Sequence, residues 1–309
     1  MNKWLILWML TLPLTATAEL YVTIIQGLGG TDQYADRFSE QTGKYTQALG
    51  ALTNSNRIRT LSGAQATRSD ILAHFQTLQK SVTANDRSAL ILIGHGSYDG
   101  HEYKFNIPGP DLTGTDIAAI MDAWPAKLQL LVVTSSASGA ILKDLQNDAR
   151  IVITATRSGN ERNAPLFGAY FAAALQDPAA DTDKNDTISA AEAYAYAERL
   201  TKDFYEGEGR LATEHSQLEG NRAEQFQLAL LTPVRPGTAS PELGQLDKQR
   251  RELDQAIAEL RLRKDEFRDN DEYLIALQEL ILKLSEVEEQ IEKLQQTDGN
   301  EAKAEEPTF

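Results

Sequence analysis

Four short apolar runs, alternating with segments of helical period, constrain the fold of this chain more than any other feature. The runs are rich in β-branched residues, which is typical of strands buried on both faces of a sheet. They cover residues 20–25, 89–93, 128–133 and 150–154, with 57–61 as a weaker fifth. Apolar residues at helical spacing cover residues 33–48, 68–78, 115–123, 139–145 and 165–175. This alternation predicts an α/β domain with a mainly parallel sheet.

Residues 1–18 have the pattern of a signal peptide. Lys3 supplies a positive start, an apolar run follows, and Ala16-Thr17-Ala18 forms a small-residue cleavage site. The run contains Pro13 and is shorter than the roughly 20 apolar residues of a spanning helix, so we expect no stable membrane insertion. The mature protein is therefore predicted to be periplasmic or extracellular.

Composition limits the chemistry that the chain can use. The chain contains no Cys, so neither a disulfide nor a cysteine nucleophile is available. Its net charge of -15 argues against nucleic acid or anionic lipid as the main partner and favours cation binding.

The C-terminal part differs in composition from the α/β domain, which we place at residues 19–233. A linker is predicted at residues 234–242, and residues 243–296 carry apolar heptad positions interrupted near residues 268–271. The interruption predicts two helices in an antiparallel hairpin, with one long helix in a dimeric coiled coil as the alternative. Residues 297–309 are polar and acidic, which predicts a disordered tail.

Two polar motifs follow neighbouring predicted strands. Gly94-His95-Gly96-Ser97 follows the run at 89–93, and Thr134-Ser135-Ser136-Ala137-Ser138-Gly139 follows the run at 128–133. Ligand sites in open α/β sheets lie just beyond the carboxyl ends of the strands. We therefore expect the functional residues of this domain in these two motifs.

These motifs resemble the caspase and legumain superfamily of cysteine peptidases, over roughly residues 20–230. Residues 155–161 and 208–215 are also similar to bacterial members of the legumain-like branch. The resemblance implies a three-layer caspase-like sandwich, with His95 as the catalytic histidine and the Gly96 N–H in the oxyanion hole. The Cys of the family pattern Ala-Cys-x-Ser-Gly falls on Ser136.

Serine at this position changes the expected chemistry. A thiol with a pKa near ~8.5 readily forms a thiolate, whereas a serine hydroxyl needs a well-aligned general base. A third group usually fixes the imidazole tautomer, and the sequence offers candidates such as Asp99 or Asp116 but no recognisable triad. Ser136 has two other interpretations: its hydroxyl caps a helix that begins near Gly139, or it contacts a ligand.

Residues 181–192 match the twelve-position calcium loop of an EF-hand. Asp186 departs from the pattern, because Gly is expected where the turn needs a positive φ. We predict a structural Ca²⁺ site; the alternative is a solvated turn that caps the following helix. The predicted oxygen ligands are Asp181, Asp183, Asn185, Thr187 through its carbonyl, Ser189 and Glu192.

These observations leave three functional hypotheses. The first is a calcium-stabilised pseudo-peptidase that binds a protein or peptide partner through its cleft, its C-terminal helices, or both. The second is an active hydrolase in which Ser136 attacks with the help of His95. The third places all function in the C-terminal helices.

Overall fold

The apolar runs form the centre of a mainly parallel sheet. The computed structural model describes residues 18–145, 147, 149–231, 241–262, 264, 267 and 269–304. Within these residues the main sheet has six strands in the order β10-β8-β7-β3-β1-β2, parallel except where β10 pairs with β8. Their bounds are β1 Leu20–Gln26, β2 Ile58–Leu61, β3 Arg87–Ile93, β7 Leu128–Val133, β8 Arg150–Thr154 and β10 Gln217–Glu219.

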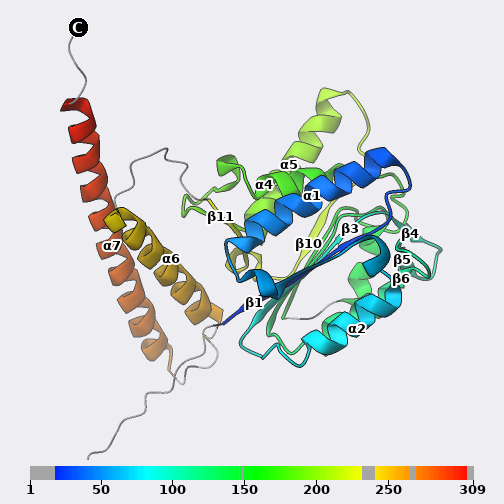
Figure 1. Ribbon diagram of the computed structural model, residues 1–309, viewed down its shortest axis with the longest axis horizontal. Helices are drawn as coiled ribbons and strands as arrows, with labels where there is room; N and C mark the ends of the chain where they lie inside the picture. The colour runs from blue at the N-terminus through cyan, green and yellow to red at the C-terminus, as the bar shows by residue number, and fades with distance from the viewer. Residues whose placement is uncertain are drawn as a thin grey trace, which may run out of the picture. The chain divides into compact units, whose positions relative to one another are not determined.

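Helices cover both faces of this sheet, which explains why its central strands are predominantly apolar (Figure 1). All residues of β3, β7 and β8 are buried. Helices α1, α4 and α5 lie on one face, and the buried side chains of α2 and α3 join the core cluster of the other face. The bounds are α1 Asp32–Gly50, α2 Arg68–Leu78, α3 Gly114–Ala123, α4 Phe167–Ala174 and α5 Ala190–Gly207.

The sequence pattern did not predict the short strands of two smaller sheets. One consists of β4 Gly96–Tyr98, β5 Tyr103–Phe105 and β6 Leu112–Thr113, and the other pairs β9 Thr187–Ser189 with β11 Gln227–Leu230. Strands of two to four residues are too short to establish an alternating pattern. The first of these sheets begins immediately after His95 and therefore shapes the strand-end region.

The segment predicted as a helix at residues 139–145 is instead a 3₁₀ helix, η3 Ser138–Asp144. It starts with a close backbone contact, because a Cβ on Gly139 would lie 2.1 Å from the carbonyl carbon of Arg157. Only glycine fits there. The loop after β7 is thereby held directly against the loop after β8.

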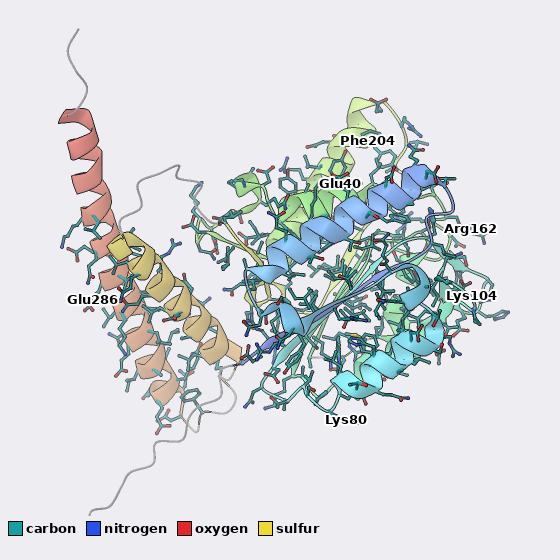
Figure 2. All side chains as sticks on the ribbon, viewed as in Figure 1. Glu40, Lys80, Lys104, Arg162, Phe204 and Glu286 are labelled. Atoms are coloured by element: carbon teal, nitrogen blue, oxygen red, sulfur yellow. The ribbon has the colours of Figure 1, made fainter. Side chains whose placement is uncertain are left out.

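The chain divides into two compact units, residues 1–231 and 232–309. The second contains α6 Pro241–Leu262 and α7 Asn270–Ala304. Leu246, near the start of α6, packs with Val287 and Ile291 of α7, so the two helices run antiparallel. Charged side chains such as Glu286 on α7, and Glu40 and Lys80 in the first unit, are exposed (Figure 2).

Two predicted boundaries in this unit are wrong. Helix α6 begins at Pro241, inside the predicted linker, and α7 continues to Ala304, well into the predicted disordered tail. Proline is favourable in the first turn of a helix, which accounts for the start of α6. The continuation of α7 passes through Thr297-Asp298-Gly299-Asn300, residues of low helix propensity, and has no local explanation. Residues 1–17, 232–240 and 305–309 lie outside the described residues, so most of the predicted signal peptide and linker is not described. In the part of the chain that is described, no helix combines the length and apolar character needed to cross a membrane.

The contact at Gly139 predicts that alanine substitutions at two glycines change the free energy of unfolding in opposite directions. Gly139→Ala forces a methyl group into the Arg157 backbone and should lower the free energy of unfolding by about 1–3 kcal/mol. Gly43→Ala, at an open position within α1, should raise it by about 0.5–1 kcal/mol. Urea unfolding of both variants measures this difference, and equal effects would contradict the close approach.

Candidate functional site

His95 follows β3 and is held in place by its surroundings. Its ring makes edge contacts with Tyr34 and Phe38 of α1, at centroid distances of 4.6 and 5.1 Å. Its Nε2 lies 3.1 Å from the carbonyl oxygen of Gly29. A carbonyl only accepts hydrogen bonds, so Nε2 carries the proton and Nδ1 of the neutral ring has the free lone pair. The Gly29 carbonyl thus fixes the tautomer of His95.

Neither carboxylate considered for that role contacts His95. Asp116 accepts two hydrogen bonds from the Arg68 guanidinium, both 2.7 Å, and belongs to the capping box of α3. Asp99 accepts from Lys104 Nζ at 2.8 Å and from two backbone N–H groups, which together hold its pKa well below the usual value. The expectation that Asp99 or Asp116 orients the histidine is therefore wrong.

Ser136 follows β7 and is 4 % exposed. Across the described ranges of the chain, its hydroxyl makes no hydrogen bond to His95. It does not cap a helix either: the residue before η3 is Ala137, in the left-handed conformation with φ 58°, and Thr156 Oγ1 accepts from the Gly139 N–H at 3.0 Å. The capping interpretation of Ser136 is wrong, because the chain turns sharply at Ala137 before the 3₁₀ helix begins.

A buried hydroxyl pair lies directly behind Ser136. Ser135 Oγ is 2.5 Å from the Tyr103 hydroxyl and donates to the Ser136 carbonyl at 3.2 Å. Burial raises the pKa of Tyr103, which keeps its phenol protonated. A Cβ on Gly96 would lie 2.7 Å from both Ser135 Oγ and Tyr103 Oη, so this packing requires glycine. Neither Ser135 nor Tyr103 was identified as a site residue from the sequence.

The backbone N–H of Gly96 is not used by the adjacent small sheet. Gly96 pairs with Phe105 across antiparallel strands, and Asn106 N donates to His95 O at 3.0 Å. This bond identifies Gly96 and Phe105 as a non-hydrogen-bonded pair, in which the N–H groups point away from the partner strand. The Gly96 N–H is therefore directed away from β5, as a donor to a ligand must be.

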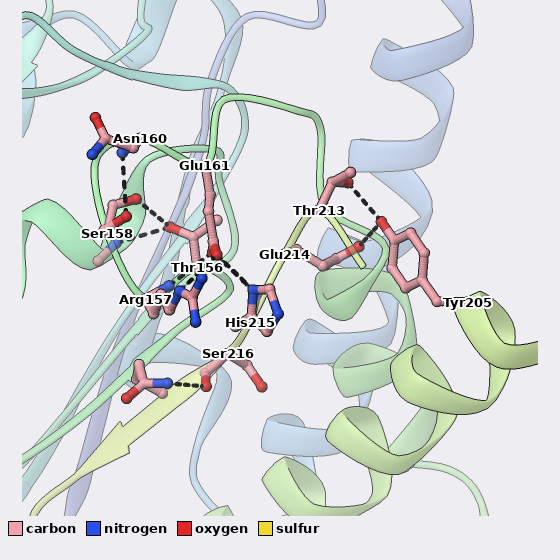
Figure 3. A network of polar contacts seen from close by, with 12 residues as sticks. Thr156, Arg157, Ser158, Asn160, Glu161, Tyr205, Thr213, Glu214, His215 and Ser216 are labelled. Atoms are coloured by element: carbon pink, nitrogen blue, oxygen red, sulfur yellow. Dashed lines mark hydrogen bonds and ion pairs between the residues drawn. The ribbon is translucent and has the colours of Figure 1, made fainter. Parts of the chain in front are cut away.

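The loops after β8 and before β10 meet in one network of polar contacts (Figure 3). A backbone hydrogen bond joins this network to the turn that contains Ser136. Ala137 N donates to the Glu161 carbonyl at 2.8 Å. The Glu161 carboxylate accepts from the backbone N–H groups of Arg157 and His215, at 3.0 and 3.1 Å, and lies 2.6 Å from His215 Nδ1. Residues 155–161 and 208–215, each singled out by resemblance, thus form one hydrogen-bonded network.

Glu214 anchors the same network to α4. Its buried carboxylate accepts from Leu166 N and Phe167 N, at 2.8 and 3.0 Å, and from the Tyr205 hydroxyl at 3.0 Å. These N–H groups belong to the start of α4, where the helix dipole favours a negative charge. Burial nevertheless outweighs the hydrogen bonds and raises the pKa of Glu214.

The predicted calcium loop brings its acidic residues together. Carboxylate oxygens of Asp181, Asp183 and Glu192 lie within 4.8 Å of one another. Asn185 Oδ1 accepts from Thr187 N at 2.8 Å, and Ser189 forms a capping box with Glu192 at the start of α5. The Asn185 and Ser189 oxygens are therefore engaged with their own chain.

The backbone of this loop accommodates the departure from the EF-hand pattern. Asp186 adopts φ 59°, the conformation for which Gly is expected at that position. Strand β9 begins at the next residue, Thr187, and Ile188 within this strand is fully buried. Burial and the charge of Glu192 raise the pKa of Asp183. Burial would also raise the pKa of Glu192, but hydrogen bonds from Ser189 and Thr182 outweigh it and lower that pKa.

Comparison with known proteins adds no assignment. No family model matches the chain, and a search of curated proteins finds no match.

The raised pKa of Glu214 predicts how stability depends on pH. The native state binds the Glu214 proton more tightly than the unfolded state, so this group's contribution is fully present below the unfolded pKa of about 4.5 and is lost as pH rises through the native value. The stability of the wild type relative to Glu214→Gln should therefore increase as pH falls towards 4.5 and then level off. Urea unfolding at several pH values measures it; a difference that decreases with falling pH would contradict the account.

Proposed function

We propose that this chain is an exported, caspase- and legumain-like pseudo-peptidase that binds a protein or peptide in the cell envelope. The α/β unit would be a three-layer caspase-like sandwich, and the C-terminal helices, as a coiled coil, would contribute to partner binding. The observation that carries the proposal is the environment of Ser136. Ser136 occupies the position at which the resemblance places the nucleophile, yet within the described residues its hydroxyl has no hydrogen bond to His95. A hydroxyl without an aligned base is a poor nucleophile.

Three further features support the proposal that a peptide is still bound at these strand ends. The Gly96 N–H is directed away from its own sheet and His95 is held by Gly29, as described above. The Ser136 turn is tied to the neighbouring loop through Ala137 and Glu161. Such an arrangement can hold a peptide carbonyl without cleaving the peptide bond.

One observation favours the alternative of an active hydrolase. The Gly29 carbonyl leaves the lone pair of His95 on Nδ1, so this ring nitrogen is available as a general base. Catalytic hydrogen bonds are often long before substrate binds, and a ligand that draws Ser136 towards His95 would complete the dyad.

A comparison of variants at position 136 distinguishes the two functions. We expect no hydrolysis of a peptide library by wild type or Ser136→Ala, and measurable hydrolysis by Ser136→Cys, because a thiolate needs less help from the base. Adding His95→Ala to Ser136→Cys should lower that rate by roughly 10²–10⁴-fold.

The control for this experiment is Ser97→Cys, which places an exposed thiol two residues from His95. Hydrolysis by wild type that Ser136→Ala abolishes would establish the hydrolase instead. Inactivity of Ser136→Cys together with failure of every variant to bind the library would contradict a retained cleft.

We further propose that Ca²⁺ stabilises the α/β unit. Three clustered carboxylates, two of them partly or fully buried, repel one another, and a hard divalent cation with oxygen ligands relieves this repulsion. Asp181, Asp183 and Glu192 would provide the charge, with Asn185, Thr187 and Ser189 completing the ligands. By binding both segments, the ion would link the start of α5 to the loop after α4.

Calcium should therefore raise the free energy of unfolding, by about 2.7 kcal/mol when its concentration is a hundred times the dissociation constant. Glu192→Gln should remove most of this increase, because it removes a charged ligand while Gln still completes the capping box. Glu206→Gln, near the exposed end of the same helix, is the matched control and should leave the increase unchanged. Urea unfolding with calcium or with chelator measures it, and an unchanged midpoint for wild type would refute the site.

A further inference from the structure

Helix α7 carries a second apolar surface besides the one that packs on α6. Tyr273, Val287 and Ile291 are buried, with exposures of 4 to 7 %. Four other large apolar side chains of α7 are exposed: Leu274 48 %, Ile275 59 %, Ile281 43 % and Leu282 56 %. Clustered exposed apolar side chains of this size mark an interaction surface.

These four residues are arranged symmetrically about Gln278. Ile275 and Ile281 lie three positions before and after it, and Leu274 and Leu282 lie four positions before and after it. Residues three and four positions apart share one face of a helix, so all five side chains lie on one face with the exposed Gln278 at its centre. A surface that reads alike in both directions from its centre is self-complementary under a twofold axis.

We propose that this face pairs with the same face of a second copy of the chain, in an antiparallel dimer whose twofold axis passes beside Gln278. Leu274 then meets Leu282 of the second copy, and Ile275 meets Ile281 of the second copy. The two Gln278 amides face each other, each able to donate and accept. Interfaces of this isologous kind are the commonest in homo-oligomers.

The proposal does not depend on the pseudo-peptidase assignment, and the absence of cysteine allows a direct test with the full chain. Gln278→Cys places one thiol per chain at the twofold axis, where facing helices bring Cα atoms within disulfide reach. It should form a covalent dimer under mild oxidation. Glu289→Cys is the matched control: it is exposed on the same helix, but its two copies would be about 33 Å apart in the dimer and should not cross-link. Equal cross-linking of the two variants would overturn the proposal.

Sedimentation of variants without an introduced cysteine provides a second test of the dimer. Ile275→Glu should abolish the dimer, without loss of helix content because this side chain is already exposed. A wild type that stays monomeric at all concentrations, or an Ile275→Glu variant that dimerises as the wild type does, would overturn the pairing.

Discussion

The close approach of three loops at the carboxyl edge of the sheet is the constraint on which the site depends. Gly139 allows the turn after β7 to touch the backbone of Arg157, and Gly96 allows the chain after β3 to pack against Ser135 and Tyr103. A side chain at either glycine would separate the loops. The parallel sheet brings these loops to one edge, and the two glycines bring their backbones into contact.

Much of the main sheet could be predicted because its central strands are buried on both faces, which leaves predominantly apolar runs in the sequence. Helix α2 also has the predicted bounds, since Thr67 caps its start and apolar residues follow at helical spacing. The short strands β4 to β6 carry no such period. The continuation of α7 through Thr297 to Asn300 could not be predicted either, because these residues have low helix propensity and no apolar period.

The placement of the two polar motifs at neighbouring strand ends could be predicted from the sequence, but the contacts that their side chains make could not. His95 and Ser136 follow adjacent strands, as expected, whereas the group that orients His95 is a backbone carbonyl, which leaves no signature in a sequence. Asp99 and Asp116 are occupied by nearby cations and backbone N–H groups. Glu161 and His215, separated by 54 positions, meet only because β10 returns beside β8. In the calcium loop, by contrast, the acidic ligands are close in sequence, and the expected cluster of Asp181, Asp183 and Glu192 is present.

We propose that position 136 lies close enough to His95 for the imidazole to influence a thiol placed there, although the Ser136 hydroxyl forms no hydrogen bond with that ring in the described residues. The most direct measurement is the pKa of the single thiol introduced by Ser136→Cys, followed by the ultraviolet absorbance of the thiolate, in the presence of His95 and after His95→Ala. Our account predicts a pKa below the ordinary value of about 8.5 that rises when His95 is removed. A thiol that titrates at or above that value in both proteins would show that burial alone governs this position, and would contradict the account.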